Sequence, residues 1–201
     1  MRVLVTGFEP FGGEKINPSW EAVKELPKKI EGAEIVKHQL PVSFKRVREK
    51  LPALIDDVKP DVVILTGQAG GRVNITVERV AINIMDARME DNEGYKPEDE
   101  PIFENAPAAY FATIPVKRVV KALRENKIPA MVSNTAGTYV CNTAMYTALH
   151  HISSNGLKAK AGFIHVPYIP EQVLEKPQPS VSLEIIREAI EIAIKESIKD
   201  Q

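Results

Sequence analysis

The chain contains a single cysteine, Cys141, in a setting that could make a thiol reactive. An apolar run, Ala130 to Val132, leads into a polar turn with Gly137, and a helix-like stretch follows from about Tyr139 to His151. This layout places Cys141 in the first turn of a helix, where free N–H groups and the helix dipole favour an anion. A thiol there is shifted toward the thiolate, the form that attacks carbonyl carbons. The pattern indicates a cysteine nucleophile, with a small apolar core residue as the alternative.

A cysteine hydrolase also needs a base, and position separates the four histidines. His165 ends an apolar, strand-like run, and open α/β folds place their sites at the carboxyl ends of strands. His150 and His151 follow Cys141 by nine and ten residues on the same helix. At about 1.5 Å per residue they lie roughly 13–15 Å away, beyond hydrogen-bond reach. His38 lies in an early strand with no turn or helix start beside it. We therefore expect His165 to be the base, with a hydrogen-bonded core histidine as the alternative.

Glu78 is the candidate for the acid that orients the histidine. It interrupts an apolar strand, so its carboxylate should be partly buried and partnered. The alternatives are a structural ion pair with a basic neighbour, or an edge-strand charge that faces water. Asn134 and Asn142 are weaker candidates for the same role, which papain-like proteases give to an asparagine.

Two glycine-containing turns follow strands and could form a ligand pocket. The first, Gly7 to Gly13, lacks the Lys-Ser/Thr pair of a phosphate-binding loop, and its proline removes a backbone donor. Its two aromatics, Phe8 and Phe11, suit the wall of a small apolar pocket, or simply anchor the turn to the core. The second, Thr66 to Arg72, could present backbone groups and Gln68 to a ligand, or be only a turn.

Hydrophobic periodicity predicts strands that alternate with helices. The strand candidates are Arg2 to Thr6, Glu34 to Leu40, Asp61 to Thr66, Asn74 to Ile84, Ala130 to Asn134 and Lys160 to Val166. The helix candidates are Pro18 to Leu26, Phe44 to Asp57, Pro115 to Asn126, Tyr139 to His151 and Val181 to Ile198. This alternation predicts an α/β fold with a sheet covered on both faces.

Two segments depart from this regular pattern. The strand candidate at 74–84 changes phase at Glu78-Arg79, which indicates a bend, bulge or hairpin. Residues 86–109 show no periodicity, and so long a segment inside a compact domain usually is a functional loop or is locally disordered. We expect a partly mobile cover over the active site.

Composition fits one globular domain, residues 1–201, with 44% hydrophobic and 26% charged residues. The net charge of -1 does not suggest a nucleic acid or an anionic membrane as partner. One cysteine excludes an intrachain disulfide and a cysteine-based metal cluster. The first residues lack the apolar stretch of a signal peptide, and no run has the length of a membrane span. We therefore expect a cytoplasmic protein.

Four motifs, in order over essentially the whole chain, resemble those of the type I pyroglutamyl peptidases. They are Val5-Thr6-Gly7-Phe8-Glu9-Pro10-Phe11-Gly12-Gly13 with Asn17-Pro18; Glu78-Arg79-Val80-Ala81-Ile82-Asn83 with Asp86-Ala87-Arg88 and Asp91-Asn92-Glu93-Gly94; Ser133-Asn134-Thr135-Ala136-Gly137-Thr138-Tyr139-Val140-Cys141-Asn142; and Phe163-Ile164-His165-Val166-Pro167-Tyr168. The resemblance implies a cysteine peptidase that removes N-terminal pyroglutamate from peptides with a Cys-His-Glu triad and no metal or cofactor. It also implies a single-domain α/β/α sandwich around a twisted, mostly parallel mixed sheet, often assembled as a homotetramer.

The resemblance further implies roles for individual residues. Cys141 matches the nucleophile, His165 the base and Glu78 its orienter. Arg88 matches the arginine assigned near the oxyanion. The matching pocket positions are Phe8, Phe11, Asn17, Gln68, Met89, Tyr139 and Val140, of which Gln68 contacts the lactam and Asn17 is a supporting polar residue. Two departures are mild, because the loop that begins at Gln68 is one of several variants and Tyr139 replaces a residue that is often phenylalanine.

The physical chemistry of the substrate agrees with such a site. Pyroglutamate is a neutral five-membered lactam with one N–H and one C=O, which a compact aromatic pocket with a few paired polar groups can hold. An ordinary N-terminus would bring an ammonium that is costly to bury unpaired. Two other functions stay open at this point. A nucleoside-phosphorylase-like enzyme could share the sandwich, and a non-catalytic binding protein could keep the pocket without the chemistry.

Overall fold

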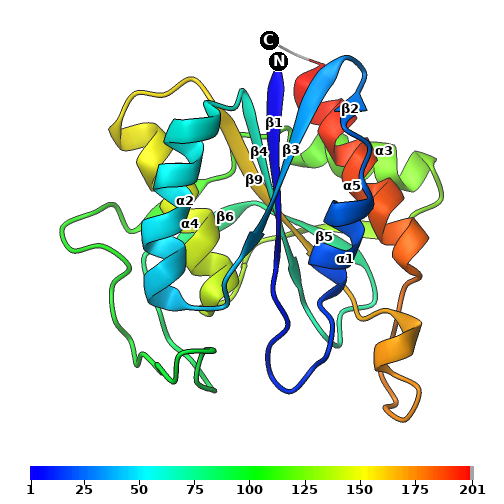
Figure 1. Ribbon diagram of the computed structural model, residues 1–201, viewed down its shortest axis with the longest axis horizontal. Helices are drawn as coiled ribbons and strands as arrows, with labels where there is room; N and C mark the ends of the chain where they lie inside the picture. Colours follow the sequence, from blue (N-terminus) through cyan, green and yellow to red (C-terminus); the bar gives the residue numbers. More distant parts are fainter. Residues whose placement is uncertain (200–201) are drawn as a thin grey trace.

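A seven-stranded sheet forms the centre of the fold, with the strand order β2-β3-β1-β4-β9-β5-β8 (Figure 1). The computed structural model describes residues 1–199. The strands are β1 (Arg2–Phe8), β2 (Lys29–Ile30), β3 (Ala33–Leu40), β4 (Val62–Gln68), β5 (Ile75–Glu78), β8 (Ala130–Ser133) and β9 (Lys160–Val166). The β1–β3, β1–β4, β4–β9 and β5–β8 pairs are parallel, whereas β2–β3 and β5–β9 are antiparallel. The predicted mostly parallel mixed sheet is confirmed.

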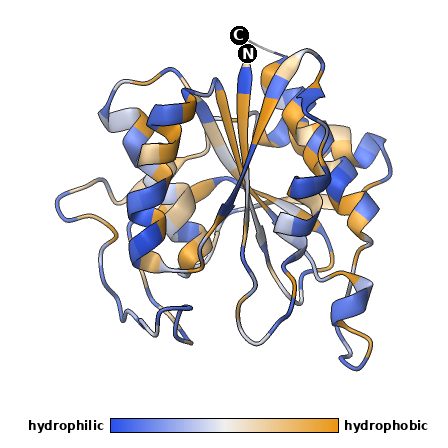
Figure 2. Ribbon diagram, viewed as in Figure 1, coloured by the Kyte–Doolittle hydropathy of each residue, from blue (hydrophilic) through white to orange (hydrophobic). Residues whose placement is uncertain are grey.

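Helices cover both faces of this sheet, as the alternation of strands and helices predicts. Helices α2 (Phe44–Val58) and α4 (Val140–Ser154) pack together on one face (Figure 1). Helices α1 (Pro18–Glu25), α3 (Val116–Glu125) and α5 (Leu183–Ile198) lie on the other. Two separate apolar cores result, and neighbouring residues of one strand belong to different cores: Val3 to one and Leu4 to the other. Because both faces are buried, the central strands contain continuous apolar runs such as Val62 to Leu65 of β4, and they become more polar toward their carboxyl ends (Figure 2).

The phase change at Glu78-Arg79 is a real break between two strands. β5 ends at Glu78 in the main sheet, and β6 (Val80–Ile82) pairs antiparallel with β7 (Ala109–Phe111) in a separate two-stranded sheet. β2, β7 and the short 3-10 helix η1 (Pro170–Gln172) were not predicted, because elements of two or three residues are too short to show periodicity. No helix among residues 1–199 is long and apolar enough to cross a membrane.

The aperiodic segment 86–109 is an anchored loop. Its buried Asp91 accepts hydrogen bonds from the backbone N–H groups of Phe44, at 2.9 Å, and of Glu93 and Tyr95, at 2.9 and 3.0 Å. The side chain of Asn92 donates to Glu9 at 2.9 Å, in the turn that follows β1. These contacts attach the loop to the start of α2 and to the turn after β1, which contains Phe8 and Phe11.

Candidate active site

The predicted nucleophile and base lie at the ends of neighbouring elements. His165, near the end of β9, pairs with Gly67 of β4 on one side and with Thr76 of β5 on the other. Cys141 is the second residue of α4. A Cβ atom added to Gly67 would lie 2.7 Å from the Cys141 Sγ atom, so the thiol occupies the space that a side chain at position 67 would fill. Since Gly67 is the strand neighbour of His165, this places the thiol beside the histidine's position in the sheet.

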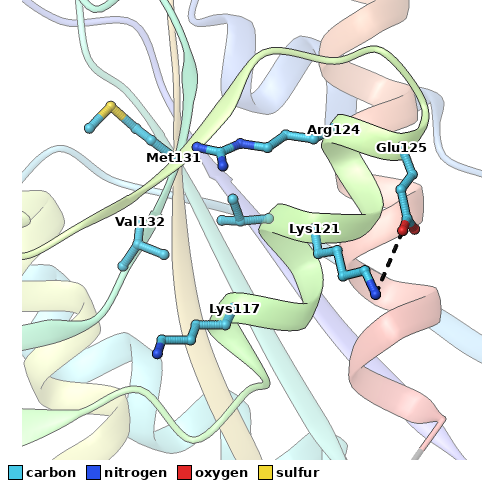
Figure 3. A pocket seen from close by; sticks show the side chains of 7 residues that line it. Lys117, Lys121, Arg124, Glu125, Met131 and Val132 are labelled. Atoms are coloured by element: carbon cyan, nitrogen blue, oxygen red, sulfur yellow. Dashed lines mark ion pairs between the residues drawn. The ribbon is translucent and has the colours of Figure 1, made fainter.

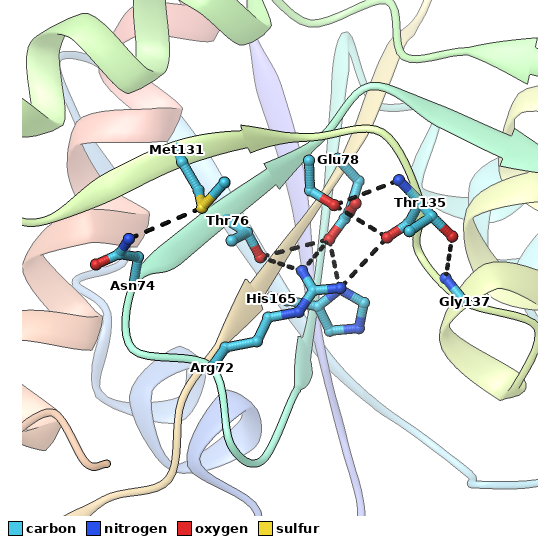
Figure 4. Close-up of polar contacts among 9 residues, drawn as sticks. Arg72, Asn74, Thr76, Glu78, Met131, Thr135, Gly137 and His165 are labelled. Carbon is cyan, nitrogen blue, oxygen red and sulfur yellow. Dashed lines mark hydrogen bonds and ion pairs between the residues drawn. The ribbon is translucent and has the colours of Figure 1, made fainter.

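Glu78 and His165 form a buried pair, shown in Figure 4, with 2.8 Å between Glu78 Oε1 and His165 Nδ1. Burial by itself raises the pKa of Glu78, but its contacts with His165, helped by Ser133 and Arg72, outweigh burial and lower that pKa. Burial lowers the pKa of His165 despite the nearby carboxylate. An ionised carboxylate only accepts hydrogen bonds, so Nδ1 carries the proton and Nε2 keeps a free lone pair. A neutral imidazole held in this tautomer is a suitable general base.

Arg72 is the residue of this site that sequence reasoning missed. Its Nη1 atom lies 2.6 Å from the same Glu78 oxygen that contacts His165, and it also donates to the hydroxyl of Thr76 (Figure 4). Its Nη2 atom donates to the carbonyl of Thr135, at 3.3 Å, in the loop that leads to α4. An ion pair between Glu78 and a basic neighbour was one of the expected alternatives, and Arg72 is that neighbour. No local pattern marks Arg72, because the contact depends on how the turn after β4 folds back toward β5.

The Cys141 thiol differs from the sequence prediction. Burial, together with the charge of Glu78, raises its pKa to about 12, and Arg72 only partly opposes them. The expected shift toward thiolate at a helix start is therefore not found in the resting site, where desolvation of the anion is the largest cause of the raised pKa. Within residues 1–199 no hydrogen bond holds the Sγ atom. The thiolate must form by transfer of the thiol proton to a base during the reaction.

A small, tightly closed pocket with a cavity volume of about 10 Å³ lies next to the thiol. It is lined by Phe8, Phe11, Asn17, Val42, Gln68, Tyr139, Val140 and Cys141. Six of the seven predicted pocket positions are in this lining. Met89 is the exception, since its side chain is 45% exposed and lies against Gly12 outside the pocket. Val42 was missed, because it belongs to the connection after β3 and no motif marks it.

The aromatic turn after β1 is both a pocket wall and an anchored loop. Phe11 packs against Tyr139 with ring centres 6.0 Å apart, and the Tyr139 hydroxyl donates to the carbonyl of Glu90 at 2.9 Å. Asn17 caps α1 by accepting from the backbone of Ser19, while its amide donates to the carbonyl of Glu9 at 3.0 Å. Asn17 thus fixes the turn that carries the two phenylalanines, as its supporting role implies.

The other candidate orienting residues, Asn134 and Asn142, and the other histidines of α4 do not contact His165 or Cys141 through any hydrogen bond within residues 1–199. Asn142 is buried and exchanges hydrogen bonds with the backbone of Ile82, while Asn134 is exposed. His150 contacts the Tyr110 hydroxyl at 3.0 Å, and His151 pairs with Asp56 at 2.7 Å. The edge-charge alternative for Glu78 is wrong, because its side chain is fully buried.

Arg88 lies beside the start of α4, outside the pocket lining. Its side chain is exposed and forms no ion pair or hydrogen bond with other residues of 1–199. The backbone on either side of it is attached to that helix start: the Asp86 N–H donates to the Thr138 carbonyl at 3.0 Å, and the Tyr139 hydroxyl reaches Glu90. Tyr139, which precedes the helix, provides no side-chain cap, so no side-chain cap occupies the N–H groups of the first turn.

Other features of the surface do not compete with this site. A wider hollow lies between α3 and β8, lined by Lys117, Val120, Lys121, Arg124, Glu125, Met131 and Val132 (Figure 3). It contains no cysteine or histidine and shares no residue with the Cys141 pocket. In the described chain, residues 1–199, no group of three or more His, Cys, Asp or Glu side chains is arranged to hold a metal ion.

A buried glutamate–histidine pair and a lone cysteine at a helix start, on an α/β/α sandwich, define a cysteine-type hydrolase. Comparison with known proteins identifies the family: the model of the pyroglutamyl peptidase family matches residues 1–200, and the chain belongs to that family. A pyrrolidone-carboxylate peptidase of Thermococcus kodakarensis is 73% identical over 200 residues, covering 100% of this chain and 97% of the relative.

Solved structures agree with this assignment. A mutant pyrrolidone carboxyl peptidase from Pyrococcus furiosus superimposes with a TM-score of 0.96 at 49% identity, and 99% of each chain is covered. The pyroglutamyl peptidase I from Bacillus amyloliquefaciens gives a TM-score of 0.95 at 49% identity, covering 98% of this chain and 95% of that one. Both similarities extend over nearly the whole of the chain.

The place of Arg72 generates a prediction about pH. Its positive charge lowers the pKa of His165, so Arg72→Met should raise that pKa. More of the base is then protonated at low pH, and the acid limb of kcat/KM should move to higher pH. Steady-state kinetics should show a larger loss at pH 6 than at pH 8, with kcat affected more than KM. Arg72→Lys keeps a charge and should recover part of the activity. A uniform loss with an unmoved acid limb would leave Arg72 only a structural role.

Proposed function

We propose that Cys141, His165 and Glu78 carry out the reaction of the pyroglutamyl peptidases, the removal of N-terminal pyroglutamate from peptides. The observation that carries this proposal is the buried Glu78–His165 contact at 2.8 Å beside a small pocket that contains the chain's one thiol. We treat residues 1–201 as one catalytic domain.

The reaction needs only these side chains and water. His165 Nε2 takes the thiol proton as Sγ attacks the carbonyl carbon of the pyroglutamyl residue. The tetrahedral intermediate collapses as the imidazolium gives its proton to the leaving amine, and a thioester remains. Water then attacks the thioester while His165 accepts its proton, which returns to Sγ as pyroglutamate leaves. Glu78 stabilises the imidazolium that exists between these transfers, and this favours proton transfer from a thiol whose resting pKa is about 12.

The pocket supports a neutral ring as the substrate group. None of its eight lining residues carries a carboxylate or a basic group. A free N-terminal ammonium would find no charged partner there, whereas a lactam needs only one donor and one acceptor. The same lining contains none of the basic side chains that commonly bind phosphate, and this argues against a phosphorylase-like function. Phe8, Phe11, Tyr139 and Val140 would enclose the ring, with Gln68 as a polar contact.

Amide hydrolysis provides the test of this function. The wild-type protein should cleave a pyroglutamyl amide and discriminate against the matched prolyl amide by about 10⁴–10⁵, since only the lactam can pair with the polar groups of the site. Cys141→Ala should lower turnover by roughly four to six orders of magnitude. Glu78→Gln should cost less, because it keeps the shape and removes only the charge.

The controls separate chemistry from folding. His38→Gln, a histidine change in β3 outside the pocket lining, should leave activity intact. Equal cleavage of both amides, or full activity after alkylation of Cys141, would contradict the proposal. Ligand binding without any product would instead favour a non-catalytic binding protein.

Arg88 generates a second prediction for this reaction. We propose that it stabilises the oxyanion together with N–H groups of the first turn of α4, because its backbone is attached to that helix start and its guanidinium has no ion-pair partner within residues 1–199. Arg88→Met should lower kcat by about 10²–10³ with little change in KM. The competing role is a tether for the 86–109 loop. A normal kcat with raised KM and faster proteolytic cleavage between Asp91 and Pro107 would support that tether and reject the oxyanion role.

The resemblance also leads us to propose a cytoplasmic homotetramer. Exposed apolar side chains on the single chain, with Phe111 at 69% and Leu174 at 83% exposure, are compatible with faces that become buried in an oligomer. Light scattering should give a mass four times the 22.3 kDa of one chain. A single-chain mass at micromolar concentration would rule the tetramer out.

A further inference from the structure

A second buried glutamine lies directly behind the pocket. Gln172, the last residue of η1, is only 8% exposed, as is Gln68. The Gln172 Nε2 atom donates a hydrogen bond of 2.9 Å to Gln68 Oε1. Gln172 is not in the pocket lining and matches none of the positions to which the family resemblance assigns a role, so any effect it has on a ligand must pass through Gln68.

Backbone groups fix the orientation of the Gln172 amide. The N–H of Ile169 donates to Gln172 Oε1 at 3.2 Å, and the carbonyl of Ile16 accepts from Nε2 at 3.4 Å. A backbone N–H can only donate and a backbone carbonyl can only accept, so exchanging the oxygen and nitrogen of this amide would break both contacts. The carboxylate of Glu14, 3.3 Å from Nε2, is a further acceptor that requires a donor there.

The fixed Gln172 amide in turn fixes Gln68. Because Gln172 presents a donor, Gln68 must face it with its oxygen, Oε1. The Nε2 atom of Gln68 is then left without a partner among residues 1–199, on a side chain that lines the pocket beside Cys141. The pocket therefore receives a hydrogen-bond donor from this side chain and no acceptor.

We propose that Gln172 is a positioning residue that sets substrate specificity, by holding the Gln68 amide with its donor directed at the ring carbonyl of the pyroglutamyl group. This inference rests on the proposed function, because it takes the ring to occupy the Cys141 pocket. A lactam carbonyl accepts from that donor. A proline ring has a methylene at the corresponding position and leaves the buried donor unpaired, which is the kind of mismatch that a polar site rejects strongly.

The decisive substitution is Gln172→Glu, which keeps the size of the side chain and reverses its hydrogen bonding. The new carboxylate, when ionised, only accepts, so the Gln68 amide should turn over and present its oxygen to the pocket. An oxygen facing the lactam carbonyl repels it. We expect kcat/KM for a pyroglutamyl amide to fall by about 10²-fold at pH 8, with a smaller loss at low pH, where the new carboxyl is protonated and donates again.

A mutant cycle shows whether Gln172 acts through Gln68. Gln68→Leu removes the donor and should by itself lower kcat/KM for the pyroglutamyl amide. In the Gln68→Leu background, Gln172→Glu should lower kcat/KM almost no further, because there is no Gln68 amide left for residue 172 to orient. Gln178→Glu, the same change at an exposed position of the same segment, is the matched control and should leave kcat/KM unchanged.

Three further readouts keep the outcomes distinct. The alkylation rate of Cys141 by iodoacetamide should stay near wild type in Gln172→Glu, while the ratio of pyroglutamyl to prolyl cleavage falls. The free energy of unfolding should also fall, because the new carboxylate is buried beside Glu14, so activity is compared under conditions where the variant stays folded. Wild-type-like selectivity in Gln172→Glu, or losses that add in the double mutant, would overturn the inference. If the wild-type protein itself fails to cleave the pyroglutamyl amide, the proposed function has failed, and the two failures are thus told apart.

Discussion

The ionised carboxylate of Glu78, buried without exposure to water, is the constraint on which the site depends. A buried carboxylate is tolerated only when it is paired and hydrogen-bonded, because its desolvation costs several kcal/mol. Its partners come from two other parts of the chain: Arg72 from the turn after β4, and His165 from β9. These contacts all reach the Oε1 atom and connect Glu78 to a turn, to the proposed base and, through Thr135, to the loop that leads to Cys141, while Oε2 has no hydrogen-bond partner within residues 1–199.

The sheet places these groups together at the point where the strand direction reverses. β4 and β9 are parallel, whereas β5 runs antiparallel to β9, so the glutamate and the histidine approach one another from strands of opposite direction. The close approach of α4 to β4 also requires a glycine at position 67, since a methyl group there would overlap both the Cys141 sulfur and the Phe163 ring.

Two features of the site act in opposite directions on the thiol. Its largely desolvated position raises the pKa of Cys141 to about 12 and keeps the thiol protonated at rest. The same lack of water strengthens the interaction of the imidazolium with Glu78 once the proton has moved. The uncharged pocket has a similar consequence for ligands: a neutral ring can be buried there, whereas an ammonium would be buried without a charged partner. Gln172 donates to Gln68 Oε1, so the Nε2 atom is the end of the Gln68 amide that is left without a partner within residues 1–199.

The sequence alone determined the order of the main strands and helices, because each has enough residues for its apolar period to be read. It also marked Cys141, Glu78 and His165, whose chemistry is unusual for their local surroundings. Tertiary structure decided the contacts between residues that are far apart in the sequence. Arg72 and Gln172 look like ordinary turn residues until folding brings the first to Glu78 and the second behind Gln68. The protonation of Cys141 likewise follows from burial and from a carboxylate 63 positions away in the chain, neither of which a helix-start pattern contains.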